Sequence, residues 1–338
     1  MIKTRRLGAS NLRVSELCLG TMMFGEQSSL EQARSIVASA FDKGVNFIDT
    51  ADIYNAGRSE TVVGQLIKPQ RYDWVLATKL GSYIDKKPNH GHYSRQWIMH
   101  QVDQSLKRLD TDYIDILYLH RDFPGSSLEE ALRAMDDLIR AGKLRSYGLS
   151  NFRGWRISEV IRLCDQAGAY RPVVCQPYYN LLNREPEVEI IPACAHHGLG
   201  VVPYSPIARG VLTGKYRPGQ TPPPGSRVDR GDKRILATEF RDESLVVAET
   251  LKQHCDKKGM ALSHFAAAWV LANPYVSSVI AGPRTPEQML DYFPALDVNV
   301  TDEEEALVDS LVAPGHGSTP GYTDPAYPFY GRKILPRD

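Results

Sequence analysis

Eight short apolar segments alternate along this chain with longer amphipathic segments, and this pattern constrains the fold more than any other feature. The apolar segments contain few alternating polar residues, which is typical of strands in a parallel sheet covered by helices. We predict strands at residues 16–19, 46–49, 74–78, 114–120, 146–150, 174–177, 200–204 and 279–281. Helical periodicity predicts helices near 30–43, 59–67, 94–108, 127–141, 154–167, 186–196, 242–258, 262–272 and 286–293.

The alternation predicts an α/β fold, a (β/α)8 TIM barrel that residues 1–338 form as a single domain. The pattern alone also allows an open, doubly wound sheet. Three segments fall outside the repeat. Residues 3–15 predict an N-terminal β-hairpin, residues 209–235 a long loop after strand 7, and the residues from 314 onward an irregular C-terminal tail.

The composition argues against two classes of partner. Forty basic and forty acidic residues cancel, so we expect no nucleic acid and no membrane surface as a partner. The five cysteines have no paired short spacing, and no secretory apolar segment follows the first residues. We therefore expect reduced thiols and a cytoplasmic protein. A homo-oligomer is compatible with this composition.

Polar residues stand where several predicted strands end, which is where barrels of this kind carry their chemistry. Asp49 ends the second strand, Lys79 follows the third, and His120 ends the fourth. Tyr54 follows Asp49 by five residues. Each residue taken alone is also explained by a salt bridge, a cap or core packing. Together they are expected to converge on one small volume at the mouth of the barrel.

These residue types suit the addition of a hydride and a proton to a carbonyl group. A phenol has a pKa of about 10, which is too high for an efficient acid near neutral pH. An ammonium group about 4 Å away, at an effective dielectric constant of about 20, would stabilise the phenolate by up to about 4 kcal/mol, or about three pKa units. We therefore assign Tyr54 as the proton donor and Lys79 as the group that lowers its pKa. Asp49 would keep Lys79 charged, and His120 would donate a hydrogen bond to the substrate oxygen.

The residues that carry this chemistry also carry a family resemblance: the sequence resembles the aldo-keto reductases over nearly its whole length. The strongest motifs are residues 46–54, Leu117-Tyr-Leu-His120, Gly148-Leu-Ser-Asn-Phe152 and Tyr204-Ser-Pro206. Their spacing resembles the branch that includes bacterial reductases and voltage-gated potassium channel beta subunits. The resemblance implies the same tetrad and an NADPH-dependent oxidoreductase that reduces a small-molecule aldehyde or ketone to an alcohol. It also implies a cofactor, NADPH/NADP+, that lies across the barrel mouth without a Rossmann glycine loop.

The resemblance further implies which residues hold the cofactor. Ser150, Asn151 and Gln176 would bind the nicotinamide carboxamide, and Tyr204 would stack on the ring. Lys215, Arg227 and Arg284 would surround the ribose phosphate and favour NADPH over NADH, although each could equally be a solvated surface charge. Relatives usually carry Gln and then Glu-Asn around the adenine, whereas Gln288 here is followed by Asp291 and Tyr292. The full implied set is Thr21, Asp49, Ser150, Asn151, Gln176, Tyr204, Ser205, Pro206, Lys215, Arg227, Gly282, Arg284, Gln288 and Asp291.

Two other classes of protein remain open. Some relatives are NADP(H)-binding regulatory or accessory subunits with little turnover, and the tetrad does not separate them from enzymes. A metal-dependent enzyme would need ligands such as His90 with His92 or His196 with His197. Their positions in a polar loop and near a helix end favour solvated residues instead.

The substrate pocket is expected to form from the loops after the strands. Arg121, directly after His120, would either favour a substrate with a negative group or form a structural ion pair. The expected pocket residues are Met22, Met23, Phe24, Trp97, Arg121 and Phe123, with Tyr322, Tyr327, Phe329 and Tyr330 of the tail closing over the mouth.

Overall fold

The computed structural model describes residues 2–84, 87–123 and 125–327. Its centre is an eight-stranded parallel sheet in the order β10-β3-β4-β5-β6-β7-β8-β9. From β3 to β9 each strand pairs with the next one along the chain, whereas a doubly wound sheet reverses its order at a switch point. The strands are β3 (Leu17–Gly20), β4 (Phe47–Asp49), β5 (Val75–Leu80), β6 (Ile114–Leu119), β7 (Leu144–Ser150), β8 (Val174–Gln176), β9 (Gly200–Val201) and β10 (Val279–Ala281).

Hydrogen bonds also join the two edges of this sheet. The amide of Ser277 donates to the carbonyl of Val201 in β9 across 2.8 Å, and the amide of Ile280 in β10 donates to the carbonyl of Pro203 across 3.0 Å. An eight-stranded parallel sheet that curls until its edges meet is consistent with the expected (β/α)8 barrel.

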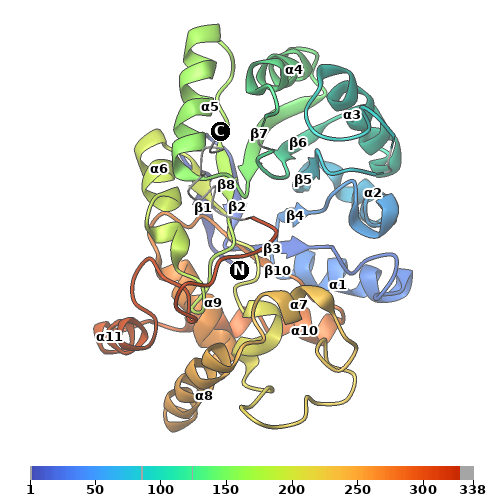
Figure 1. Cartoon of the computed structure of the whole chain (residues 1–338). Helices are drawn as coiled ribbons and strands as arrows, with labels where there is room; N and C mark the ends of the chain where they lie inside the picture. The colour runs from blue at the N-terminus through green and yellow to red at the C-terminus, as the bar shows by residue number, and fades with distance from the viewer. Residues whose placement is uncertain (1, 85–86, 124, 328–338) are drawn as a thin grey trace, which may run out of the picture.

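Helices surround the strands on the outside of the sheet (Figure 1). Several begin at a serine whose side chain accepts a hydrogen bond from a first-turn amide, as Ser29, Ser94 and Ser127 do. The α-helices are α1 (Leu30–Asp42), α2 (Arg58–Ile67), α3 (Arg95–Leu109), α4 (Leu128–Arg140), α5 (Gly154–Ala167), α6 (Ile190–His197), α7 (Lys233–Ala237), α8 (Asp242–Lys257), α9 (Leu262–Ala272), α10 (Pro286–Leu290) and α11 (Asp302–Leu311). The 3-10 helices are η1 (Tyr54–Gly57), η2 (Lys68–Asp73), η3 (Glu185–Glu187), η4 (Ala208–Thr213) and η5 (Phe293–Asp297). None of the described helices combines the length and apolarity needed to cross a membrane.

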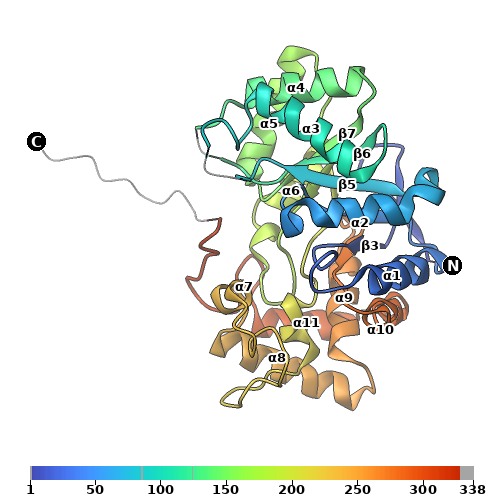
Figure 2. The same ribbon diagram turned by 90° about the vertical axis from the view of Figure 1, so that its right-hand side faces the viewer.

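Alternate strand residues form a cluster on the concave side of the sheet. A short antiparallel pair, β1 (Thr4–Arg6) and β2 (Arg13–Ser15), adds Leu7 and Val14 to this cluster, and both side chains are fully buried. The first and the last described residues lie on opposite sides of the molecule (Figure 2). The strand residues of the cluster include Cys18, Phe47, Val75, Ala77, Ile116, Tyr118, Val174 and Ile280.

Four segments differ from the sequence expectation. Strand β9 stops at Val201, because Pro203 has no amide hydrogen to donate to a neighbouring strand. Residues 209–235 are not wholly a loop, since they include most of η4 and the start of α7. The helix expected near 286–293 ends at Leu290, and η5, with Pro294 in its first turn, follows it. Helix α11 was not foreseen.

Candidate active site

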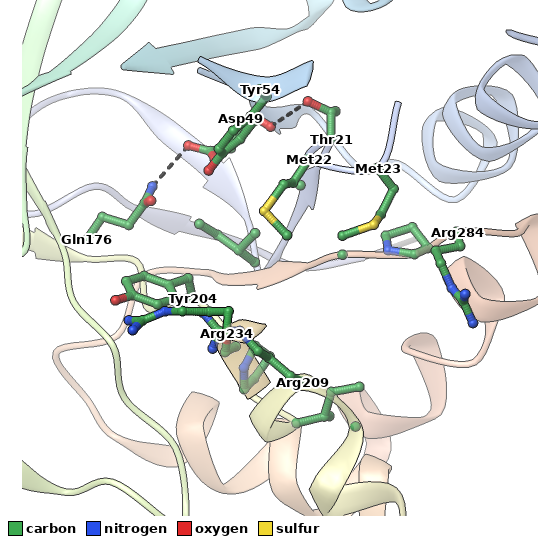
Figure 3. Close-up of a pocket in the computed structure, with 18 of the residues that line it drawn as sticks. Thr21, Met22, Met23, Asp49, Tyr54, Gln176, Tyr204, Arg209, Arg234 and Arg284 are labelled. Carbon is green, nitrogen blue, oxygen red and sulfur yellow. Dashed lines mark hydrogen bonds between the residues drawn. The ribbon is translucent and has the colours of Figure 1, made fainter. Parts of the chain in front are cut away.

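A cavity of about 430 Å³ opens at the carboxyl ends of the strands. Figure 3 shows side chains from several of these strands, and from the segments after them, directed toward the same space. The cavity extends from Tyr54 and His120 past Tyr204 to Lys215 and Arg284. Residues from widely separated parts of the chain therefore line the same cavity.

The alternation of side chains along each strand explains why polar groups meet here. Phe47, Ala77 and Tyr118 belong to the cluster on the concave side of the sheet. Successive side chains of a strand point to opposite faces, so the residues two positions further along point to the concave side as well. These residues are Asp49, Lys79 and His120. An apolar cluster therefore ends in one layer of ionisable groups.

Lys79 is the centre of this layer, with its side chain only 1 % exposed. Its ammonium group donates to a carboxylate oxygen of Asp49, to the carbonyl of Thr50 across 2.8 Å, and to the hydroxyl of Tyr54 across 3.3 Å. Burial by itself lowers the pKa of Lys79, but Asp49 and Tyr54 outweigh burial and the pKa is raised. The ammonium group therefore stays charged, with all three hydrogens engaged.

Asp49 is held from two further directions. The side-chain amide of Gln176 donates to its second carboxylate oxygen across 2.9 Å, and the hydroxyl of Thr21 donates to its main-chain carbonyl across 3.0 Å (Figure 3). Ser59 accepts or donates hydrogen bonds with the hydroxyls of Thr21 and Thr50 at 3.0 and 2.9 Å. These contacts fix both the carboxylate and the strand end that carries it.

A strained turn positions Tyr54. Asn55 and Ala56 have positive φ angles of 50° and 56°, and Gly57 follows with 86°. Left-handed backbone is unfavourable for alanine and persists where the surroundings impose it. Here the side chain of Asn55 donates to the carbonyls of Met22 and Phe24 at 3.0 and 2.7 Å, which ties the turn to the loop after β3.

The pKa of Tyr54 differs from the sequence expectation. Burial raises this pKa above its ordinary value of 10.0, and Lys79 only partly opposes the effect. We expected Lys79 to lower the pKa overall, because the sequence does not reveal how completely the phenol is enclosed. Tyr54 is consequently neutral, and carries its proton, throughout the physiological pH range.

His120 completes the layer as a neutral imidazole. Burial, and then the charges of Lys79 and Arg121, lower its pKa well below 6.5. Its ring meets that of Tyr54 edge-on, with centroids 6.2 Å apart, and its Nδ1 atom is buried without a hydrogen-bond partner among the described residues. A neutral ring retains one N–H group that can be donated.

A polar network adjoins the layer at the ends of β7 and β8. Asn151, with a positive φ of 58°, donates to the carbonyl of His120 across 3.0 Å and accepts from the hydroxyl of Tyr204 across 2.8 Å. Ser150 donates to the carbonyl of Gln176 across 3.0 Å. The ring of Tyr204 is stacked on that of Tyr178, with centroids 5.5 Å apart, and thus presents a supported flat face to the cavity.

Excess positive charge marks the far end of the cavity. Within the described part of the chain, no carboxylate forms an ion pair with Lys215 or Arg284, whereas Arg227 pairs with Asp232 at 2.9 Å. Burial, and then Arg284, Arg227 and Arg230, lower the pKa of Lys215. Burial, and then Arg230 and Arg227, lower the pKa of Arg284. A cluster of cations of this kind can attract an anion such as a phosphate.

The structure brings nearly all of the expected site residues together. Every residue of the implied cofactor set lines the one cavity, and Lys79 lies directly behind Asp49 and Tyr54. Of the expected substrate-pocket residues, Met22, Met23, Arg121 and Tyr327 line the cavity. Those that do not line it are Phe24, Trp97, Phe123 and Tyr322, while Phe329 and Tyr330 lie outside the described residues.

Sequence reasoning missed two arginines that line the cavity. Arg209 pairs with the fully buried Glu239, and Arg234 pairs with Asp324. Both belong to the segment between β9 and α8 that we expected to be a loop. Arg209 directly precedes Gly210. A larger residue at position 210 would crowd Lys215, because its Cβ would lie 3.0 Å from the ammonium nitrogen.

The candidate metal ligands do not form a metal centre. His90 is stacked on Trp97, and His92 on Phe123, with centroids 4.7 and 4.2 Å apart. His197 shares a hydrogen bond of 2.9 Å with Ser158. The described residues contain no group of three or more potential ligands that could hold a metal ion.

Comparison with known proteins shows the family to which this chain belongs. Residues 16–313 match the model of the aldo/keto reductase family, and the chain belongs to that family. Over 317 residues it is 37 % identical to a probable voltage-gated potassium channel subunit beta of Arabidopsis thaliana, covering 90 % of this chain and 96 % of the relative.

Two further relatives are named as oxidoreductases. The uncharacterized oxidoreductase YrpG of Bacillus subtilis (strain 168) is 33 % identical, with 93 % of this chain and 97 % of the relative covered. The versiconal hemiacetal acetate reductase of Aspergillus parasiticus is 30 % identical, with 92 % and 98 % covered. The family and these relatives indicate an oxidoreductase of small carbonyl compounds.

Proposed function

We propose that this protein reduces aldehydes or ketones to alcohols with NADPH, and that Tyr54 is the proton donor. The observation that carries the proposal is the chain of contacts from Asp49 through Lys79 to the hydroxyl of Tyr54. We further propose that the curled sheet is a (β/α)8 barrel and that the chain forms one domain, because the two edges of the sheet are hydrogen-bonded to each other.

The residues around the cavity fit a dinucleotide. NADPH, when bound, would supply the hydride. Ser150, Asn151 and Gln176 offer hydroxyl and amide groups for a carboxamide, and Tyr204 offers a flat face for an aromatic ring. Ser205 and Pro206, and then Thr21 and Gly282, would line the path of the pyrophosphate and the remaining sugar. The residues proposed to hold the adenosine phosphate and the adenine are Lys215, Arg227, Arg284, Gln288 and Asp291.

The unpaired charge at Lys215 and Arg284 supports NADPH over NADH. Burial, and then repulsion between the cations, lower the pKa values of both residues, and a phosphate on the adenosine ribose would offset both effects. NADH carries a neutral hydroxyl at that position and would leave the cations unpaired. Charge-assisted hydrogen bonds to a phosphate are about twice as strong as neutral ones.

The tetrad would act on the carbonyl oxygen. Tyr54 gives its proton to the oxygen as negative charge develops there, and Lys79 stabilises the phenolate that remains. Asp49 keeps Lys79 charged and oriented. His120, neutral because of its lowered pKa, would donate a hydrogen bond to the same oxygen and hold it within reach of the hydroxyl of Tyr54.

A direct assay tests this proposal. The purified full-length chain is incubated with a panel of aldehydes and ketones and with NADPH or NADH, and oxidation of the reduced cofactor is followed. We expect carbonyl-dependent oxidation, faster with NADPH. If the protein neither binds NADPH nor oxidises it with any carbonyl compound of the panel, the proposal is wrong.

A second candidate is a regulatory subunit that binds NADP(H) with little turnover. The relatives named as potassium channel beta subunits favour it. Tight NADPH binding without oxidation by any carbonyl of the panel would select this alternative.

A further inference from the structure

Arg121 is a cation of the cavity that the proposed mechanism does not use. It directly follows His120 and lines the cavity beside it. No carboxylate of residues 2–84, 87–123 and 125–327 forms an ion pair with it, and the adjacent Asp122 pairs with Arg156 at 3.1 Å. The sequence left open whether Arg121 forms a structural ion pair. In the described chain Asp122 forms one with Arg156, and Arg121 forms none.

Aromatic rings hold the guanidinium group in place. Its central carbon lies 5.0 Å from the ring centroid of Tyr327 and 5.8 Å from that of Phe123, within the range of cation–π attraction. The main chain of Arg121 is fixed as well, because its amide donates to the hydroxyl of Tyr93 across 3.1 Å and its carbonyl accepts from the same hydroxyl. Such contacts restrain the side chain and leave its N–H groups available.

This positive charge is separate from the one assigned to the cofactor phosphate. Arg284, Arg227 and Arg230 act on the pKa of Lys215, whereas Arg121 acts on the pKa of His120. Arg121 therefore lies at the end of the cavity where the carbonyl would react.

Two other cations that line the cavity are paired with carboxylates. Arg209 pairs with Glu239, and Arg234 with Asp324. Among the described residues, the reacting end thus has Arg121 as a guanidinium group without a counter-charge, and the apolar side chains of Met22 and Ile53 also line the cavity. An anion bound among apolar groups interacts more strongly than it would in water.

We propose that Arg121 binds an oxyanion, a carboxylate or a phosphate, that is part of the carbonyl substrate. The planar guanidinium fork matches either group with two parallel hydrogen bonds. The preferred substrate is then an anionic aldehyde or ketone. This inference rests on the proposed reductase function and adds its substrate class.

The test compares substrates that differ in charge and little else. The pairs are para-carboxybenzaldehyde with its methyl ester, and glyceraldehyde phosphate with glyceraldehyde. For each pair, the ratio of kcat/KM for the anionic member to that for the neutral member is measured in the wild type, Arg121→Gln and Arg121→Lys. Arg145→Gln is the matched control, since Arg145 is an exposed residue near the amino end of β7.

We expect the wild type to favour the anionic member of at least one pair. Loss of a charged hydrogen-bond donor should reduce the ratio by about 10- to 100-fold in Arg121→Gln. Arg121→Lys should recover part of the ratio, and Arg145→Gln should retain it. The pair that responds distinguishes a carboxylate substrate from a phosphorylated one.

A binding measurement keeps this inference distinct from the proposed function. Terephthalate has two carboxylates and no aldehyde, and we expect calorimetry to detect its binding to the wild type and not to Arg121→Gln. Equal ratios in the wild type and Arg121→Gln, with both aldehydes reduced, would overturn the anion proposal alone. Failure of every carbonyl to react would overturn the proposed function, and terephthalate binding would still report on Arg121.

Discussion

Lys79 in β5 donates a hydrogen bond across 3.3 Å to the hydroxyl of Tyr54, which lies 25 residues earlier in the turn after β4. The parallel pairing of β4 with β5 brings the two segments together, with Asp49 opposite Ala77 in the register. Lys79 follows Ala77 by two residues. Its side chain is therefore the next one in β5 that points inward, beyond the carboxylate that binds it. The relationship joins a strand position and a strained turn in one hydrogen-bonded unit.

Replacing Asp49 by asparagine should destabilise the fold markedly. The change leaves the ammonium group of Lys79, 1 % exposed, without its counter-charge, and breaking a buried pair costs about 3–5 kcal/mol. Urea denaturation measures the free energy of unfolding. The control is Asp110→Asn, which breaks an ion pair with Lys68 whose partners are 64 % and 62 % exposed and should cost under about 1 kcal/mol. Equal losses in the two variants would contradict the role given to Asp49.

Lys215→Ala and Arg284→Ala should weaken NADPH binding much more than NADH binding. Each variant removes one cation that no carboxylate of the described chain neutralises, and the expected loss for NADPH is about 10- to 100-fold. Fluorescence titration with both nucleotides gives the two dissociation constants. Arg217→Ala serves as the control, because Arg217 is 51 % exposed and 4.0 Å from Glu249. If both nucleotides lose affinity equally, the phosphate assignment is wrong.

Asp52 should make stability depend on pH. The residue is 2 % exposed, and both of its carboxyl oxygens are buried. Burial, and then Glu60, raise its pKa from 3.8 to about 8, with Arg108 and Lys79 opposing. Between pH 3.8 and about pH 8, the carboxyl group of Asp52 keeps its proton in the folded state and has lost it in the unfolded state. Stability therefore decreases as the pH rises through this window, and the full cost is present above about pH 8.

Asp52→Asn removes this titration, so the variant should gain stability relative to the wild type as the pH rises. The gain is at most about 1.4 kcal/mol for each pH unit between the two pKa values. Urea denaturation of both proteins across this range provides the difference, in which the other titrating groups cancel. A difference that stays constant with pH would show that Asp52 has an ordinary pKa.

Several features of the site could be predicted because the ends of the strands determine them. Asp49, Lys79 and His120 stand where predicted parallel strands end, and the carboxyl ends of such strands meet at one mouth of a barrel. The unforeseen helix α11 was also open to prediction. Thr301 and Glu304 form a capping box at its start, and the spacing of these two residues is a known signal for a helix N-terminus.

Other features depend on contacts between distant segments, which a single sequence does not reveal. Arg209 and Arg234 lie in a segment without periodicity, and their partners Glu239 and Asp324 are 30 and 90 residues away. Likewise, nothing local shows that Asp122 pairs with Arg156, or that Arg121 has no ion pair with any of the described residues.

The central claim is that the hydroxyl of Tyr54 provides the proton, and Tyr54→Phe tests it most directly. The variant removes one oxygen atom and retains the ring that packs beside His120. We predict that kcat for aldehyde reduction falls by about 100- to 10,000-fold, while the dissociation constant for NADPH, measured by fluorescence titration on the same preparation, remains close to that of the wild type. Turnover by Tyr54→Phe at the rate of the wild type would contradict the account.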